Sequence, residues 1–108
     1  MLLAQPYGSI EWLVNGELGN AAELSVARMI IAPGATSASH SHSNCEEAAY
    51  VIRGAVEEVI GDEVFGMVAG QCAVAPRGIP HYFRNVGSAD AEVLLFFSSA
   101  HRAYEQHD

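Results

Sequence analysis

The sequence predicts an all-β fold, either a barrel or a sandwich of antiparallel strands. Short apolar runs recur along the chain, turn-forming Gly, Pro, Asn and Asp residues separate them at close intervals, and no long stretch has a strong helical period. Half of the 108 residues are apolar and 17% are charged, a composition that favours a packed core over disorder. Because this length suits one core, we expect residues 1–108 to form a single domain.

Two strand-forming regions come before the first Pro-Gly pair. Residues Ser9 to Leu18 contain Asn15-Gly16, a pair typical of a tight β-hairpin turn, and Trp12 and Leu18 are candidates for its buried face. The run from Glu23 to Ile31 is apolar and β-branched enough for a strand that enters the core. Pro33-Gly34 then ends this strand with a turn.

The middle of the chain predicts a strand and a hairpin. Ser43 to Cys45 is turn-like, and the run from Glu47 to Arg53 forms a strand that stops at Gly54. Residues Ala55 to Ile60 and Glu63 to Met67 are expected to pair around Gly61-Asp62, which suits a tight turn with positive φ.

The last third predicts three further strands. They are a short one from Gln71 to Ala75, one within Ile79 to Asn85 after the turn at Pro76 to Gly78, and a final apolar one from Glu92 to Ser98. The polar tail from Ser99 to Asp108 is expected to be irregular or a short helix.

Histidines and carboxylates gather in the segment PGATSASHSHSNCEEAAYVIRG, residues 33–54. If His40 and His42 lie on a strand, their imidazoles point to the same side. Glu46 and Glu47 follow shortly after, and a further histidine, His81, lies in the segment GQCAVAPRGIPHYFRN. Because imidazoles and carboxylates are good ligands of divalent transition metals, these two segments suggest a metal site.

The spacing of these residues resembles the two motifs of the cupin family. Gly34, His40, His42, Glu47 and Gly54 fill every fixed position of the first motif, G(X)5HXH(X)4E(X)6G. The second motif, G(X)5PXG(X)2H(X)3N, is filled as completely by the following five residues: Gly70, Pro76, Gly78, His81 and Asn85. The resemblance implies a double-stranded β-helix, that is, a jelly-roll barrel.

The resemblance also implies a metal centre inside the barrel. Carried over by position, the ligands are His40, His42, Glu47 and His81, and strand alternation would turn the competing Glu46 outward. Three imidazoles and a carboxylate form a nitrogen and oxygen site that accepts one divalent Fe, Mn, Ni, Cu or Zn ion. Such a set leaves coordination positions open for water or substrate, as in catalytic rather than structural sites.

Other residues are candidates for the pocket wall. Phe83 follows His81 by two positions and should share its face, where it would wall the pocket or, equally well, pack in the core. Arg28 interrupts an apolar strand and could anchor a carboxylate substrate, although a solvated edge position is favoured. Tyr50 is a weaker candidate, better explained as a surface or core aromatic. His101 and His107 have no matching spacing and are expected on the surface.

Charge and cysteine content restrict the partners and the compartment. The formal charge of −8 argues against nucleic acid and anionic membranes, since no basic stripe exists to hold phosphates. No apolar run approaches the ~20 residues of a transmembrane helix, and MLLAQPYG lacks the features of a secretory signal. Cys45 and Cys72 form no CxxC motif, which favours reduced thiols in a cytoplasmic protein, although Cys45 could line the mouth of the site.

The family resemblance implies a metal-dependent enzyme that acts on a small organic molecule inside the barrel, with dioxygenase, isomerase or lyase chemistry. Since fold and ligands do not choose a reaction, the alternative is a non-catalytic module that binds or senses a sugar or carboxylate. The resemblance further implies a homodimer, in which the segment from Ser9 to Leu18 would pair with the partner or be exchanged between the two protomers.

Overall fold

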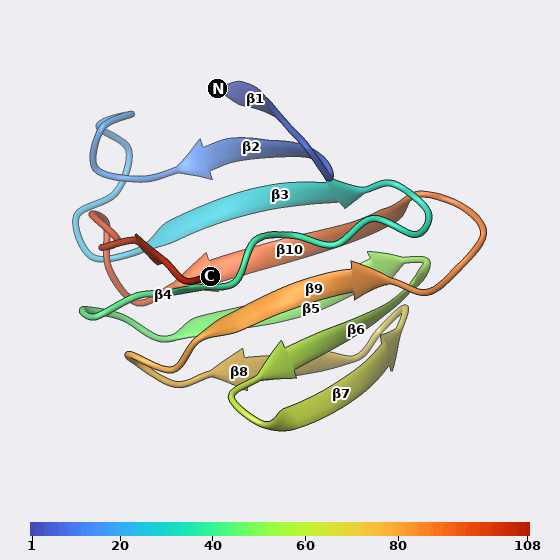
Figure 1. Ribbon diagram of the computed structural model, residues 1–108. Coiled ribbons are helices and arrows are strands. Elements are labelled where there is room, and N and C mark those ends of the chain that lie inside the picture. The colour runs from blue at the N-terminus through green and yellow to red at the C-terminus, as the bar shows by residue number, and fades with distance from the viewer.

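A computed structural model describes all residues, 1–108, and shows two antiparallel sheets facing each other (Figure 1). The first sheet has six strands in the order β1-β2-β3-β10-β5-β8, and the second has five in the order β11-β4-β9-β6-β7. The strands are β1 (Leu2–Gln5), β2 (Gly8–Val14), β3 (Ser25–Ile31), β4 (His40–Ser41), β5 (Glu47–Arg53), β6 (Ala55–Ile60), β7 (Glu63–Val68), β8 (Cys72–Ala75), β9 (His81–Asn85), β10 (Ala91–Phe97) and β11 (Glu105–Gln106).

The strands from β3 to β10 begin and end close to the predicted positions. The strand at Glu47–Arg53 and the hairpin of β6 and β7 are confirmed, and Gly61 in the hairpin turn has a φ of 59°. At Gly54 the chain passes from β5 in the first sheet to β6 in the second. This glycine has a φ of 90°, and a Cβ there would lie 2.9 Å from the Cα of Ala91, so a larger residue is excluded.

The predicted hairpin at Asn15-Gly16 is wrong. Instead β1 pairs with β2 across Pro6-Tyr7, and β2 pairs with β3. The Asn15 side chain accepts a hydrogen bond from Leu18 N at 2.8 Å, which folds these residues into a local turn, and Leu18 is exposed. The tail contains no helix; it is irregular apart from β11, which pairs with β4.

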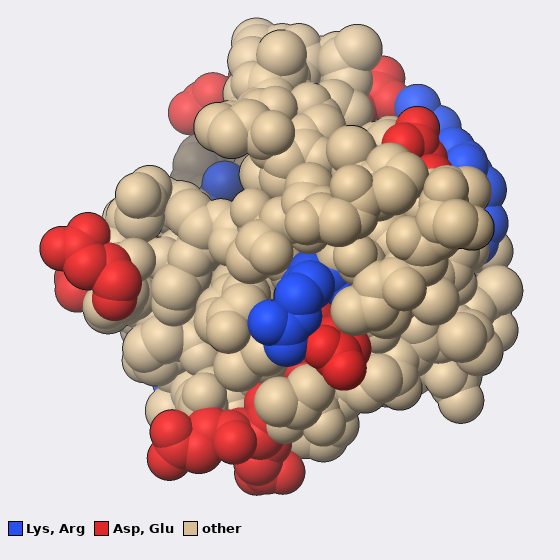
Figure 2. Space-filling model, turned by 45° about the vertical axis from the view of Figure 1, so that its right-hand side comes forward, with Lys and Arg blue, Asp and Glu red and all other residues tan.

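The core lies between the two sheets and follows from strand alternation. Every second residue of β3, β9 and β10 is buried, which places Met29, Phe83 and Leu95 in the interior. The fold has no helix of the length and apolar character that a membrane span requires. Figure 2 shows one face of the molecule, on which acidic side chains lie in several separate groups and basic side chains are fewer.

Asn85, the last fixed residue of the second motif, fastens the loop after β9. It is buried, its Nδ2 donates to Ile31 O at 2.8 Å and Ala89 O at 2.9 Å, and its Oδ1 accepts from Gly87 N at 2.8 Å. We expect Asn85→Ala to lower the free energy of unfolding by about 3 kcal/mol, because buried polar groups lose their partners. Urea unfolding measures this, with Asn20→Ala as the control: Asn20 is exposed, and its loss should cost about 1 kcal/mol or less. Equal costs would show that Asn85 has no such role.

Candidate metal centre

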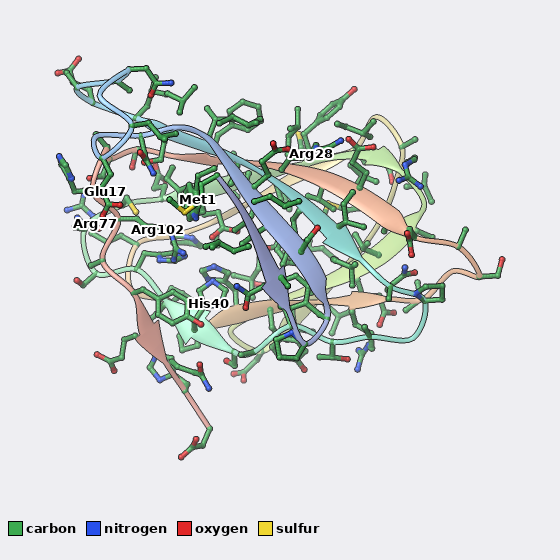
Figure 3. The ribbon with its side chains drawn as sticks, turned by 90° about the horizontal axis from the view of Figure 1, so that it is seen from above. Met1, Glu17, Arg28, His40, Arg77 and Arg102 are labelled. Carbon is green, nitrogen blue, oxygen red and sulfur yellow. The ribbon has the colours of Figure 1, made fainter.

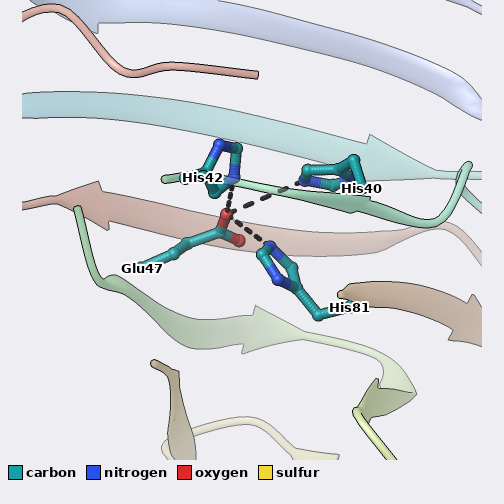
Figure 4. A group of neighbouring side chains, drawn as sticks. All are labelled: His40, His42, Glu47 and His81. Carbon is teal, nitrogen blue, oxygen red and sulfur yellow. Dashed lines mark hydrogen bonds and ion pairs between the residues drawn. The ribbon is translucent and has the colours of Figure 1, made fainter. Parts of the chain in front are cut away.

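Four side chains from three strands converge in the space between the sheets (Figure 4). His40 lies on β4 and His42 just after it, Glu47 begins β5, and His81 begins β9 directly opposite His40. One ligand atom from each of these residues lies within 4.8 Å of those of the others. His42, Glu47 and His81 are buried and His40 is half-buried, so the cluster has one partly open side. The turn at Pro76 to Gly78 ties the two segments together, since Gly78 N donates to His42 O at 2.8 Å.

Backbone carbonyls orient all three imidazoles. The Nδ1 atoms of His40, His42 and His81 lie 2.9, 2.7 and 2.9 Å from carbonyl oxygens of the chain, which belong to Ala38, Ala103 and Ile79. Because a carbonyl can only accept, each Nδ1 carries the proton, and each Nε2 is left toward the centre. This arrangement of outer partners is typical of histidines that ligate metals.

The carboxylate of Glu47 completes the cluster and fits a cation. Its Oε1 lies 2.9 Å from Nε2 of His42 and 3.0 Å from Nε2 of His81, while Nε2 of His40 is 3.9 Å away. Its Oε2 is buried without any partner. With Nδ1 protonated, neutral imidazoles would turn Nε2 lone pairs toward these oxygens, so either a proton or a cation is required between them. The donor set therefore suits a divalent metal.

In the metal-free cluster, Glu47 and His81 shift each other's pKa in opposite directions. Burial raises the pKa of Glu47, but hydrogen bonds from the imidazoles and the charge of His81 outweigh burial and hold that pKa well below its usual range. Burial lowers the pKa of His81, and the hydrogen bond and charge of Glu47 more than reverse this, so the pKa of His81 is raised. A metal would replace these shared protons, so binding should release protons at acidic pH.

A cavity of about 610 Å³ opens onto this cluster. His40 and Glu47 line it, and apolar side chains form much of its wall, among them Ile10, Met29 and Leu95. Phe83, predicted to share the face of His81, also lines the cavity and is buried.

Two weaker candidates for the pocket wall lie outside the cavity, in the surface positions that the sequence favoured for them. Arg28 is on the outer side of the six-stranded sheet, paired with Glu92 at 3.2 Å and Glu11 at 3.3 Å (Figure 3). Tyr50 is exposed on β5. Strand alternation explains both, since each is next in sequence to inward-facing residues. Glu46 is exposed, as predicted.

The tail supplies wall residues that sequence reasoning missed. Arg102 and Tyr104 line the cavity, Tyr104 stacks on His40 with ring centroids 4.9 Å apart, and Ala103 O holds His42. His107 is half-buried rather than on the surface, with Nε2 2.7 Å from Ser41 Oγ. Only the alternation of Arg102 and Tyr104 in the printed sequence could have suggested a shared face.

A second buried carboxyl, that of Glu58 on β6, was also missed. Val56, Glu58 and Ile60 alternate inward, so strand period alone places it in the core, where both carboxylate oxygens lack partners. Burial, and secondly the charge of Glu47, raises its pKa to about 8. Cys45 is a buried free thiol whose pKa is raised by burial and then by Glu47, so it is an unreactive cysteine.

Fold and site together define a small β-barrel protein with a buried cluster of three histidines and one glutamate. A family profile described as a cupin domain matches residues 27–97. The chain belongs to the cupin family, and the double-stranded β-helix expected from its motifs is confirmed by the solved structures that it resembles.

Among curated proteins, the chain is 32% identical over 97 residues to oxalate oxidase GF-3.8 of Triticum aestivum, covering 82% of this chain and 42% of that protein. The chain thus spans less than half the length of this relative. An oxalate oxidase solved in complex with glycolate matches with a TM-score of 0.83 and 27% identity, over 94% of this chain and 56% of that one. The oxalate decarboxylase of Lactobacillus farciminis, solved as a formate complex, shares the fold with a TM-score of 0.91 at 21% identity, over 98% of this chain and 33% of that one.

Proposed function

We propose that His40, His42, Glu47 and His81 hold one divalent transition metal, and that the protein is a metal-dependent enzyme acting on a small organic molecule in the cavity. The observation that carries this proposal is the convergence of three oriented Nε2 atoms on a carboxylate whose Oε2 is buried without a partner. The choice among Fe, Mn, Ni, Cu and Zn is left to measurement, because this donor set accepts each of them.

The residues of the chain have separable tasks in this proposal. When bound, the metal supplies Lewis acidity or electron transfer to a molecule beside it. Carbonyl-bonded imidazoles keep the ligands in one orientation, and the apolar wall limits water. Tyr7 lines the same cavity. Burial, and after it the charge of Tyr104, raises the pKa of Tyr7 to about 12. Its hydroxyl therefore stays protonated at neutral pH and can donate a hydrogen bond to a bound molecule.

Oxidation or decarboxylation is the reaction class we favour within this proposal, because the relatives and neighbours reported above are oxalate oxidases and oxalate decarboxylases. Isomerase or dioxygenase chemistry would use the same centre. The alternative is a non-catalytic binding module, and one observation favours it: apart from the proposed ligands, no carboxylate or imidazole lines the cavity to act as a general base.

Turnover by the metal-loaded protein tests the enzyme proposal. We expect protein loaded with Mn or Fe to convert at least one compound in a screen of oxalate, other small organic acids and sugar acids, followed by oxygen consumption and by product analysis. Chelation should abolish the turnover because it removes the Lewis acid or redox centre, and added metal should restore it. Stoichiometric metal without any turnover in this screen would reject the enzyme and favour the binding module.

We also propose a homodimer in the cytoplasm. The outer face of the six-stranded sheet supports the dimer, since Tyr50, Val74 and Phe96 are exposed there on the adjacent strands β5, β8 and β10. Two free cysteines, one of them exposed, are consistent with a reducing compartment.

A further inference from the structure

Arg102 is a half-buried cation without an acidic partner. The chain has five basic residues, all of them arginines, and Arg28, Arg53 and Arg84 form ion pairs with glutamates on outer faces. Arg102 makes no such pair. Its guanidinium instead lies over the rings of Trp12, Tyr104 and Phe97, at 4.7, 5.0 and 5.4 Å from their centroids.

The tail holds this guanidinium in a fixed place beside the cluster. Asn44 Nδ2 donates to His101 O and Asn44 Oδ1 accepts from Ala103 N, both at 2.8 Å, so the residues on either side of Arg102 are clamped. Ala103 O also accepts from His42 Nδ1. Figure 3 shows Arg102 near His40 in the space between the sheets, and both line the cavity. An arginine held in place on the wall of a cavity is a ready partner for a planar anion.

The cavity wall offers one cation to that anion. Arg102 is the one basic side chain that lines it, apart from the proposed ligand His40. On this wall a single guanidinium matches one carboxylate group, because its planar fork forms one bidentate pair, and a metal held by the cluster would add its own charge beside Glu47.

The size and lining of the cavity limit the rest of the molecule. About 610 Å³ is a volume typical of sites for drug-sized ligands, far more than a two-carbon acid fills. Ile10, Met29 and Leu95 present apolar surface between the sheets. Half of the 16 residues that line the cavity are hydrophobic, so a molecule that fills it can bury an apolar body as well as its acid group.

We propose that Arg102 binds the carboxylate of a monocarboxylic acid whose apolar body fills the cavity and places the reacting carbons beside His40 and Glu47. Only the statement that these carbons react rests on the proposed function. The acid would bind here whether or not it is converted. It makes Arg102 the residue that selects the substrate class and places that class beyond oxalate.

Ligand binding tests the proposal separately from catalysis. Trp12 is the only tryptophan and contacts Arg102, so its fluorescence reports on an acid bound there. The probes are hexanoate and hexanamide, which have nearly the same shape and differ in charge. We expect saturable binding of hexanoate by the purified wild-type protein, checked by calorimetry, and binding of hexanamide and of oxalate weaker by about tenfold or more.

Arg102→Gln should weaken hexanoate binding by about tenfold or more, and Arg102→Lys should weaken it less, because the charge remains without the planar fork. Arg28→Gln, which removes the same charge from the outer surface, is the matched control and should bind as the wild type does. Metal content and melting temperature are measured for every variant. If Arg102→Gln has a lowered melting temperature, the test relies on Arg102→Lys. The proposal would be overturned if Arg102→Lys bound both the acid and the amide with the affinities of the wild type. Equal binding of the acid and the amide by the wild type would also overturn it. Failure of the metal site would appear in the metal content and leave this comparison intact.

Discussion

His81→Ala should emerge from purification with little or no bound metal, whereas the wild type carries close to one equivalent. His81 offers an Nε2 that is oriented by Ile79 O and lies 3.0 Å from Glu47 Oε1, so its loss removes one proposed ligand from a buried cluster. Since even the outer partners of a ligand are worth about 10- to 100-fold in metal affinity, losing the ligand itself should cost about 100-fold or more. Elemental analysis and a metal titration of the stripped protein measure this.

The tail offers a matched histidine for that experiment. His101 is exposed and lies outside the cluster, so His101→Ala should retain the metal of the wild type. An intact fold must be shown for His81→Ala by circular dichroism. A folded His81→Ala protein with undiminished metal would remove His81 from the site.

Glu58→Leu should stabilise the metal-free protein, and the gain should grow with pH. The carboxyl of Glu58 is buried with both oxygens unpartnered, and its pKa in the folded chain is about 8 against an ordinary value of 4.5. The folded state thus keeps a proton that the unfolded state releases, so stability is greatest below about pH 4.5 and falls as pH rises toward 8. At about 1.4 kcal/mol per pKa unit, the loss reaches roughly 5 kcal/mol above pH 8.

Urea unfolding at about pH 5 and about pH 8.5 measures this dependence. The wild type should lose stability between the two values relative to Glu58→Leu, and Glu58→Gln serves as the control of similar shape that cannot ionise. Parallel changes in all three proteins would show that the Glu58 carboxyl does not carry the raised pKa. At every pH at which it ionises, the Glu58 carboxyl lowers the stability of the fold. It faces the same interior as the cluster.

The sequence specifies most of the fold and the cluster because the relevant information is local. Alternation within β5 and β9 turns Glu47 and His81 inward, and glycine and proline at fixed positions set the turns between strands. The hairpin at Asn15-Gly16 was mispredicted because the same dipeptide allows a local turn in which the Asn15 side chain bonds to Leu18 N.

The remaining parts of the site depend on contacts between distant residues. His42 and Ala103 are 61 positions apart. The alternation of Arg102 and Tyr104 suggests a shared face, but it does not indicate that the tail covers the cavity. Arg28 was a candidate to anchor a carboxylate because it interrupts an apolar strand, although a solvated edge position was favoured. Its ion pair with Glu92 across β3 and β10 is visible only once the strand order is known.

Anomalous diffraction from crystals of the wild-type protein loaded with Mn²⁺ or Co²⁺ tests the central claim most directly. The proposed site predicts one strong peak between the Nε2 atoms of the three clustered histidines and the carboxylate of Glu47, with Oε2 no longer unpartnered. A loaded crystal with no peak there, or with its peak among surface carboxylates, would contradict the metal centre.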